Sequence, residues 1–480
     1  MRRREFFRNT SLGLLGTTLA APLRGLAAPA VKKGQVAKNI IFMVSDGMSN
    51  GTLSMASLLR RRMEGRQSHW LQLYEQQRAV RALMDTASAS SLVTDSAAAS
   101  SAWGGGHRVN NGSLNVGPDG ISHTPILQQF KAAGKATGCV TTVPITHATP
   151  AGFCINNSHR GDMAEIATQY LPLRFDVMMG GGAEYFSAST RKDKTDLFKS
   201  YTDAGYTVVQ SRSEMLQLPA QHTRPILGVF HDDGLPFSLD RNQEKAQQQQ
   251  VPTLAEMTQC AIQQLKQNKN GFVMQVEGGK VDWAAHSNDA GALLYDQLAF
   301  DDAIGVALKF AEEDQQTLVI ITTDHGNANP GLYYNDKAND RFDQVQHYRY
   351  TNEWILKGIN KSQSPAAVIE RIHYAQGIAI SDAEAASLLK NYANLSEEGL
   401  YNPHKLPFRE LAMIQAGYTS INWGGMEHTA DFVELAMTGP GSELLRPFVK
   451  NTDLHYLMLE ASGLQADALK KAQTIRASSV

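Results

Sequence analysis

The sequence predicts an α/β fold: a three-layer sandwich in which helices flank a large, mostly parallel central sheet, with an added insertion or cap. Short apolar runs, typical of strands buried on both faces, alternate along the chain with segments of helical spacing. The 480 residues are 42% hydrophobic and 19% charged, which is typical of a globular chain with a sizeable core. The predicted strands are residues 40–44, 137–143, 176–179, 272–276 and 318–322.

Helical periodicity is clearest over residues 254–266 and 290–311, between predicted strands. This alternation of strands and helices favours a parallel sheet covered on both faces. The polar tract Gln247–Gln250 is interpreted as a solvated loop edge.

The stretch from about 329 to 418 differs in composition from the rest of the chain. It is rich in Asn, Tyr, Lys and Glu and has helical patterns at 365–376 and 382–394. We interpret it as an insertion or cap on the sheet and not as an independent domain. Such an insertion would build a lid or the contact of a homodimer.

The first thirty residues have the order of a targeting signal. The twin arginines Arg3 and Arg4 precede a short apolar stretch, and Ala28-Pro29-Ala30 offers a small-residue cleavage site. This pattern predicts a twin-arginine export signal over residues 1–30, and therefore a periplasmic or secreted protein. Residues 31–480 are then the folded domain.

Charge and hydropathy exclude two classes of partner. Without residues 1–30, the chain has 40 Lys and Arg against 46 Asp and Glu, a formal charge of −6. A protein that binds the nucleic-acid backbone normally has a basic excess, so specific nucleic-acid binding is not expected. No apolar run approaches 18 residues, so no membrane span is expected either.

The cysteine count is odd, with Cys139, Cys154 and Cys260. A full disulfide framework is therefore excluded, and a twin-arginine substrate is expected to fold in the reducing cytosol before export. One bond between Cys139 and Cys154 is compatible with the sequence.

Acidic residues end three of the predicted strands: Asp46, Glu277 and Asp324. One such acid is usually a turn residue or a helix cap. Three together at the carboxyl edge of a parallel sheet indicate a ligand site. Converging carboxylates repel one another unless cations lie between them, so the pattern predicts metal ions.

Histidines supply nitrogen ligands for the same ions. Asp282 and His286 stand four residues apart, so on a helical turn both side chains point the same way. Alone, that spacing more often reflects a surface pair, but Glu277 lies five residues upstream, and His325 and His428 each follow an acid. Mixed ligands of this kind suit zinc where nitrogen is abundant and magnesium where oxygen dominates.

Ser96 is the expected nucleophile, because small helix formers follow it and a helix N-terminus attracts anions. Taken alone, however, Asp95-Ser96 is far more often simply a helix cap, because Ser and Asp are the favoured N-cap residues. Arg160 could fork onto phosphate oxygens, although an arbitrary arginine is more often a solvated surface residue.

Seven motifs between about residues 39 and 441 resemble those of the metal-dependent alkaline phosphatases, in the same order. They are Asp46-Gly47-Met48, Thr94-Asp95-Ser96-Ala97-Ala98, His147-Ala148-Thr149-Pro150, Glu277-Gly278-Gly279, Asp282 with His286, Thr323-Asp324-His325-Gly326 and Glu427-His428-Thr429.

The resemblance implies two zinc ions, one magnesium ion and a serine nucleophile, Ser96. It also implies that Arg160 binds phosphate and that His147 and Trp283 lie just outside the third metal site. The ligand sets it implies are Asp282, His286 and His428 for the first zinc, Asp46, Asp324 and His325 for the second, and Asp46, Thr149 and Glu277 for magnesium.

The expected activity is hydrolysis of small phosphate monoesters through a phosphoserine. A phosphodiesterase of the same superfamily is one alternative. A secreted phosphate- or metal-binding protein without turnover is the other.

Overall fold

The computed structural model describes residues 34–393, 395, 405–465 and 471. The predicted export signal at 1–30 lies outside these residues. Within them, none of the helices combines the length and apolar character that crossing a bilayer requires.

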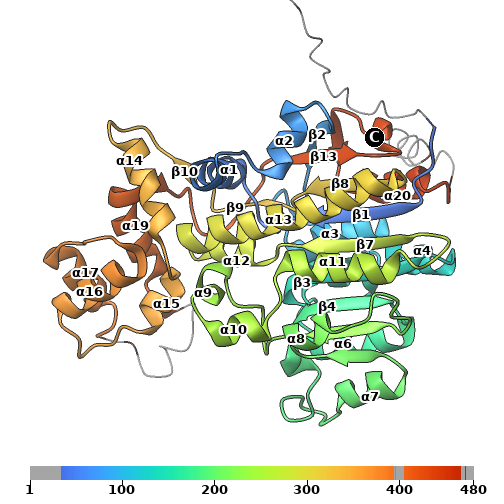
Figure 1. The fold of residues 1–480 in the computed structure, drawn as a ribbon, viewed down its shortest axis with the longest axis horizontal. Helices are drawn as coiled ribbons and strands as arrows, with labels where there is room; N and C mark the ends of the chain where they lie inside the picture. Colours follow the sequence, from blue (N-terminus) through green and yellow to red (C-terminus); the bar gives the residue numbers. More distant parts are fainter. Residues whose placement is uncertain (1–33, 394, 396–404, 466–470, 472–480) are drawn as a thin grey trace, which may run out of the picture. The chain divides into compact units, whose positions relative to one another are not determined.

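A ten-stranded sheet forms the centre of the fold, in the order β14-β2-β13-β8-β1-β7-β3-β4-β6-β5 (Figure 1). The predicted mostly parallel sheet is confirmed, since β13 alone runs against its neighbours β8 and β2. The strands are β1 (Asn39–Val44), β2 (Val80–Asp85), β3 (Ala136–Pro144), β4 (Val177–Gly181), β5 (Thr207–Val209), β6 (Ile226–Val229), β7 (Phe272–Glu277), β8 (Thr317–Thr322), β13 (Val433–Thr438) and β14 (Phe448–Lys450).

The five strands predicted from sequence are the buried ones in or near the middle of this sheet. β1 pairs in parallel with β7 and β8, and Val44 lies opposite both Glu277 and Thr322. The three strands therefore end at the same level. The acids that follow them meet at one edge of the sheet.

The other five strands escaped prediction because they are short or only partly buried. In β2 the burial alternates, with Ala82 and Met84 inside and Arg81 and Leu83 exposed. β5 has only three residues. Runs of this kind lack the continuous apolar pattern of a strand buried on both faces.

Helices cover both faces of the sheet, as predicted. In β1, Phe42 and Val44 contact one apolar layer, while Ile41 and Met43 contact the other. The first layer includes residues of α3 (Ser96–Gly105), α4 (Ile126–Ala132), α5 (Ala148–Cys154), α6 (Met163–Leu173), α7 (Leu197–Asp203) and α20 (Asp453–Ala461). The second includes residues of α2 (His69–Glu75), α8 (Arg212–Leu216), α11 (Leu254–Leu265), α12 (Lys280–His286) and α13 (Ala290–Asp314).

A third apolar core lies beneath the helices of the stretch that was interpreted as a cap (Figure 1). It also includes Met55 and Leu59 of α1 (Asn50–Glu64) and Leu294 of α13, so these helices pack on the main body. They are α14 (Ala338–Asp343), α15 (Asn352–Lys357), α16 (Pro365–Gln376), α17 (Asp382–Lys390) and α19 (Phe408–Thr419), with the 3-10 turn η2 (Gln344–His347). The exact extent 329–418 stays a prediction.

One loop prediction was wrong. Gln247–Gln250 form the last turn of α10 (Lys245–Gln250), which follows α9 (Ser238–Arg241). The loop was predicted because the tract is polar, but glutamine is a good helix former and a polar tract can form an exposed helix.

All three cysteines are free. The Sγ atoms of Cys139 in β3 and Cys154 in α5 lie 3.7 Å apart in the core. The structure therefore has the two thiols in contact and not bonded.

Helices α3 and α5 pack closely because glycines stand where they cross. A Cβ added to Gly152 of α5 would lie 2.6 Å from Cβ of Ser100 in α3, and one added to Gly104 would meet the carbonyl of Gly152. Any side chain at either glycine would push the two helices apart.

Gly152→Ala should therefore destabilise the protein by about 1–3 kcal/mol, the usual cost of overpacking a core. Gly417→Ala is the control, since the added methyl group meets no atom within 4 Å in α19. It should be neutral or stabilising by about 0.5–1 kcal/mol. Equal melting temperatures for the two variants would show that the helices do not need this close approach.

Candidate functional site

Buried carboxylates gather at the carboxyl edge of the central strands. Asp46, Glu277 and Asp324 are each 0% exposed. Within the described residues, Asp46 Oδ1, Glu277 Oε1 and Asp324 Oδ2 have no hydrogen-bond partner. Buried ionised oxygens without partners are strongly unfavourable, so these side chains fit a site that holds cations.

Three groups of side chains each bring one ligand atom per residue within 4.8 Å of one another. They are Asp282, His286 and His428; Asp46, Asp282 and His325; and Asp46, His147 and Glu277.

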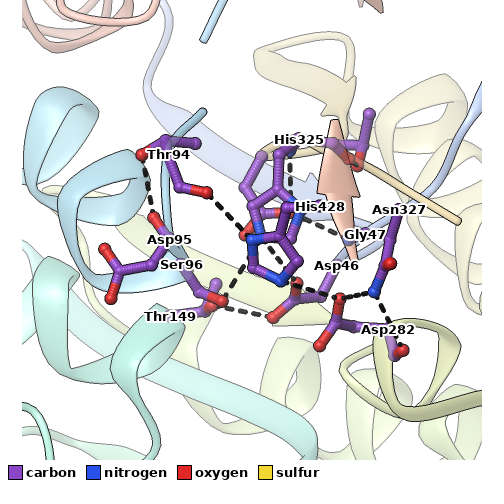
Figure 2. Close-up of polar contacts among 12 residues, drawn as sticks. Asp46, Gly47, Thr94, Asp95, Ser96, Thr149, Asp282, His325, Asn327 and His428 are labelled. Atoms are coloured by element: carbon purple, nitrogen blue, oxygen red, sulfur yellow. Dashed lines mark hydrogen bonds and ion pairs between the residues drawn. The ribbon is translucent and has the colours of Figure 1, made fainter. Parts of the chain in front are cut away.

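The first group has the same members as the first zinc set expected from sequence. Next to the second group, Asp324 Oδ2 lies 3.1 Å from Nε2 of His325. Next to the third, Thr149 Oγ1 donates to Asp46 Oδ2 at 3.0 Å. All eight expected ligands thus converge, and His147, expected just outside the third metal site, lies with them. Figure 2 shows Asp46, Thr149, Asp282, His325 and His428 of this set.

Backbone carbonyls orient the three histidines. Nδ1 of His286 donates to the carbonyl of Met426 at 2.7 Å, that of His428 to Thr94 at 2.9 Å and that of His325 to Gly326 at 3.3 Å. Nε2 of each ring therefore faces the site, which is the arrangement of metal-bound histidines whose Nδ1 donates to a carbonyl.

Two of these Nε2 atoms face each other. The Nε2 atoms of His286 and His428 are 3.0 Å apart. While both rings are neutral and donate from Nδ1 to carbonyls, neither Nε2 has a proton to donate to the other. A cation bound by both would remove the repulsion between their lone pairs.

His428 comes from far along the chain. The short strands β9 (Gly326–Asn327) and β12 (His428–Thr429) pair antiparallel, with His428 opposite Asn327. A second pair, β10 (Gly331–Leu332) and β11 (Ile421–Asn422), joins the two ends of the stretch that includes α14–α19. These ladders place His428 beside the loop with Asp324 and His325.

The electrostatics also favour cations. Burial, followed by the charges of Asp324, Asp282 and Glu277, raises the pKa of Asp46 well above its usual value. Burial also raises the pKa of Glu277 to about 8. Both groups would be held ionised at neutral pH by bound cations.

Ser96 is the first residue of α3 and is buried. Its Oγ lies 3.4 Å from Nε2 of His325, at the long end of hydrogen-bond distance. Asp95 is the N-cap, because its Oδ1 accepts from the amide of Ala98 at 2.9 Å. The capping that the sequence left open thus belongs to Asp95, and the Ser96 hydroxyl faces the ligand groups (Figure 2).

Arg160 is aimed at the site by two contacts. Its Nη1 donates to Asp95 Oδ2 at 2.9 Å, and its Nη2 donates to His147 Nε2 at 3.1 Å. Burial and the charge of Arg160 lower the pKa of His147 to about 3, so the imidazole is neutral and accepts this bond. The ring of Trp283 meets the His147 ring edge-on, with centroids 6.2 Å apart.

Sequence reasoning missed the residues that support this set. Asp95 pairs with Arg160, Asn327 donates to Asp282 Oδ1 at 2.7 Å, and Thr141 donates to Glu277 Oε2 at 2.5 Å. The sequence offered Asp95 as a possible helix cap, but its pairing with Arg160 has no local signal. Asn327 and Thr141 have no local signal, because their partners come from other strands and helices.

The fold and the site define a metal-dependent α/β enzyme. The family model "Alkaline phosphatase" matches residues 37–464. Alkaline phosphatase 4 of Bacillus subtilis is 31% identical over 94% of this chain and 97% of its own. The crystal structure of Thermus thermophilus alkaline phosphatase has a TM-score of 0.82 at 32% identity, covering 96% of this chain and all of that one. A cold-active alkaline phosphatase from Shewanella sp. has a TM-score of 0.74 at 26% identity, over 89% of this chain and all of that one.

The chain therefore belongs to the alkaline phosphatase family and is an enzyme of that family.

Removing bound metal should destabilise the protein more as the pH rises. The pKa of Glu277 is about 8 in the metal-free fold against 4.5 in the unfolded chain. Between these values the folded state binds more protons than the unfolded state, so the free energy of unfolding falls with rising pH. Bound cations would keep the carboxylates ionised and remove that loss.

The measurement is the melting temperature of chelated and metal-reloaded protein from pH 5 to pH 8.5. We expect the difference between the two to widen up to about pH 8. A constant difference would contradict the assignment of these acids as ligands.

Proposed function

We propose that this enzyme hydrolyses small phosphate monoesters and releases inorganic phosphate through a phosphoserine at Ser96. The observation that carries the proposal is the placement of the Ser96 hydroxyl at a helix start, 3.4 Å from His325 Nε2 within the buried ligand groups. Family membership supports the same reaction class.

We further propose two zinc ions and one magnesium ion. Asp282, His286 and His428 would hold the first zinc, and Asp46, Asp324 and His325 the second. Asp46, Thr149 and Glu277 form the oxygen-rich set that suits magnesium. When bound, such ions favour the serine alkoxide and stabilise the charge on the phosphoryl and leaving oxygens.

The chain's own residues bind and orient the substrate. Because Asp95 caps α3, the Ser96 hydroxyl and the amides of the first helical turn are fixed in orientation. Both can then face the phosphate group of the ester. Arg160 uses two of its N–H groups for Asp95 and His147, so its guanidinium is held ready for phosphate oxygens.

The reaction then has two displacements. Ser96 Oγ gives up its proton and bonds to phosphorus, while the bond from phosphorus to the ester oxygen breaks and that oxygen takes up a proton, so the alcohol leaves. A water oxygen then gives up a proton and bonds to phosphorus, the bond from phosphorus to Ser96 Oγ breaks, and Oγ takes up a proton. The second step restores the serine hydroxyl and releases phosphate. Because the transferring phosphoryl needs little covalent help, orientation and charge stabilisation supply most of the rate.

Export through the twin-arginine signal at 1–30 is a separate proposal, supported by the order of its basic, apolar and small-residue parts. It would place the enzyme in the periplasm or outside the cell. Amino-terminal sequencing of exported protein would test it.

Nitrophenyl phosphate should be hydrolysed far faster than the bis-nitrophenyl diester. Exhaustive chelation should abolish both rates, and adding back zinc and magnesium should restore them. A metal-free preparation with full monoesterase activity would contradict the metal assignment.

The comparison of the two esters separates the alternative functions. A preference for the diester would make the enzyme a phosphodiesterase. Binding of phosphate with no turnover of either ester would make it a binding protein.

Ser96→Ala should lower kcat by at least about a thousandfold, since the nucleophile is lost. Wild-type enzyme quenched at acid pH after labelled phosphate should carry the label on the peptide that includes Ser96. Ser101→Ala is the matched control, because Ser101 lies in the same helix with its hydroxyl on the carbonyl of Ala97. Label on another peptide would refute the assignment.

Arg160→Ala should mainly weaken binding. We expect KM for the monoester and the inhibition constant of phosphate to rise at least about tenfold, because charge-assisted contacts to the anion are lost. The fall in kcat should be smaller. Arg224→Ala, on an arginine that bonds only backbone carbonyls, should leave both constants unchanged. A variant with normal KM and low kcat would place Arg160 in the chemical step.

A further inference from the structure

A buried lysine lies next to the site and is used by none of the steps above. Lys280, the first residue of α12, is 6% exposed. Its ammonium nitrogen lies 3.8 Å from the ring centroid of Phe237 and 4.3 Å from that of Trp283. Among the described residues this nitrogen has no hydrogen-bond or salt-bridge partner, so the two aromatic rings are its contacts.

Two opposing effects act on the pKa of this ammonium. Burial lowers the pKa of Lys280, while the charges of nearby acids oppose that shift: Glu353, Asp296, Asp233 and Asp240. The contacts through which this cation can act are therefore the rings of Phe237 and Trp283.

What Lys280 contacts is the indole of Trp283, which is confined from another side as well. A Cβ added to Gly234 would lie 2.8 Å from the Trp283 ring, so the backbone there lies against the indole. The indole in turn meets the His147 ring edge-on. Its position thus limits where His147 can lie.

His147 in turn helps to orient Arg160 through a hydrogen bond. Its Nε2 accepts from Arg160 Nη2, and Nη1 of the same guanidinium pairs with Asp95. These two contacts determine the plane of the guanidinium, and a bidentate fork needs that plane to match the phosphate. A rotation of His147 would remove one of the two supports.

We propose that Lys280 is a positioning residue for phosphate binding, which acts through Trp283 and His147 on the orientation of the Arg160 guanidinium. The inference rests on the proposed role of Arg160. It predicts that the charge on Lys280 matters for anion affinity even though Lys280 does not touch the anion.

Lys280→Met tests this by removing the charge while keeping the length and apolar stem of the side chain. KM for nitrophenyl phosphate and the inhibition constant of inorganic phosphate should both rise on the order of tenfold, the scale seen when supporting groups are lost. The change in kcat should stay within about twofold. Lys280→Arg keeps a cation between the rings and should restore most of the affinity.

The control is Lys266→Met, which removes an exposed lysine at the C-terminal end of α11. It should change neither constant. Zinc content and melting temperature are measured for every variant. If Lys280→Met is too unstable to assay, Phe237→Leu removes one of the two rings, leaves the charge, and should give a smaller rise in the same two constants.

A double-mutant cycle tests the proposed route. In the Arg160→Ala background, Lys280→Met should raise neither constant further, because its effect passes through the arginine. Independent effects that multiply would overturn the inference. Unchanged constants in Lys280→Met would also overturn it. A loss of zinc in proportion to the loss of affinity would overturn it too, because Lys280 would then support helix α12, which includes Asp282 and His286.

Failure of the proposed function would look different. If the wild-type enzyme hydrolyses no monoester, calorimetric titration with inorganic phosphate still compares wild type, Lys280→Met and Arg160→Ala. If the wild type is active and Lys280→Met matches it in both constants, the inference fails and the function stands.

Discussion

Mutual repulsion among buried carboxylates is the constraint on which the site depends. Asp46, Asp282, Glu277 and Asp324 lie at the ends of strands and at the start of a helix, where the backbone leaves them little freedom to move apart. Such a cluster is unfavourable without cations and favourable with them. The rest of the site is arranged around that requirement: histidines turn their Nε2 atoms inward because backbone carbonyls accept hydrogen bonds from Nδ1.

Helix packing positions Ser96, the proposed nucleophile, at the start of α3. Glycines at the crossing of α3 and α5 let two helices that contribute Ser96 and Thr149 approach at backbone distance. Asp95 then does two things at once, since one carboxylate oxygen caps α3 and the other holds Arg160. Asp95 thereby holds both Ser96 and Arg160, the proposed nucleophile and the proposed phosphate-binding arginine.

Sequence reasoning identified the middle of the sheet and most of the acids and histidines that converge at the site, for a shared reason. Strands buried on both faces produce continuous apolar runs, and an acid directly after such a run is visible without knowledge of the fold. The edge strands β5 and β14, and β2 next to β14, produce no such run, because one face is exposed or the strand is short. The Gln247–Gln250 turn was misjudged because polarity does not distinguish an exposed helix from a loop.

The sequence by itself determined the α/β class, the strand-end acids and the Asp282–His286 pair, because each depends on spacings of a few residues along one element. Only the tertiary structure decided which distant segments meet. The β9–β12 ladder places His428 beside Asp324 and His325, although His325 lies 103 residues upstream of His428. Likewise, no local pattern shows that Lys280 lies between Phe237 and Trp283, or that Arg160 reaches Asp95. Such contacts join distant segments whose packing depends on the whole core. Sequence periodicity shows which residues share a face of one helix or strand, but not which residue of another element they will contact.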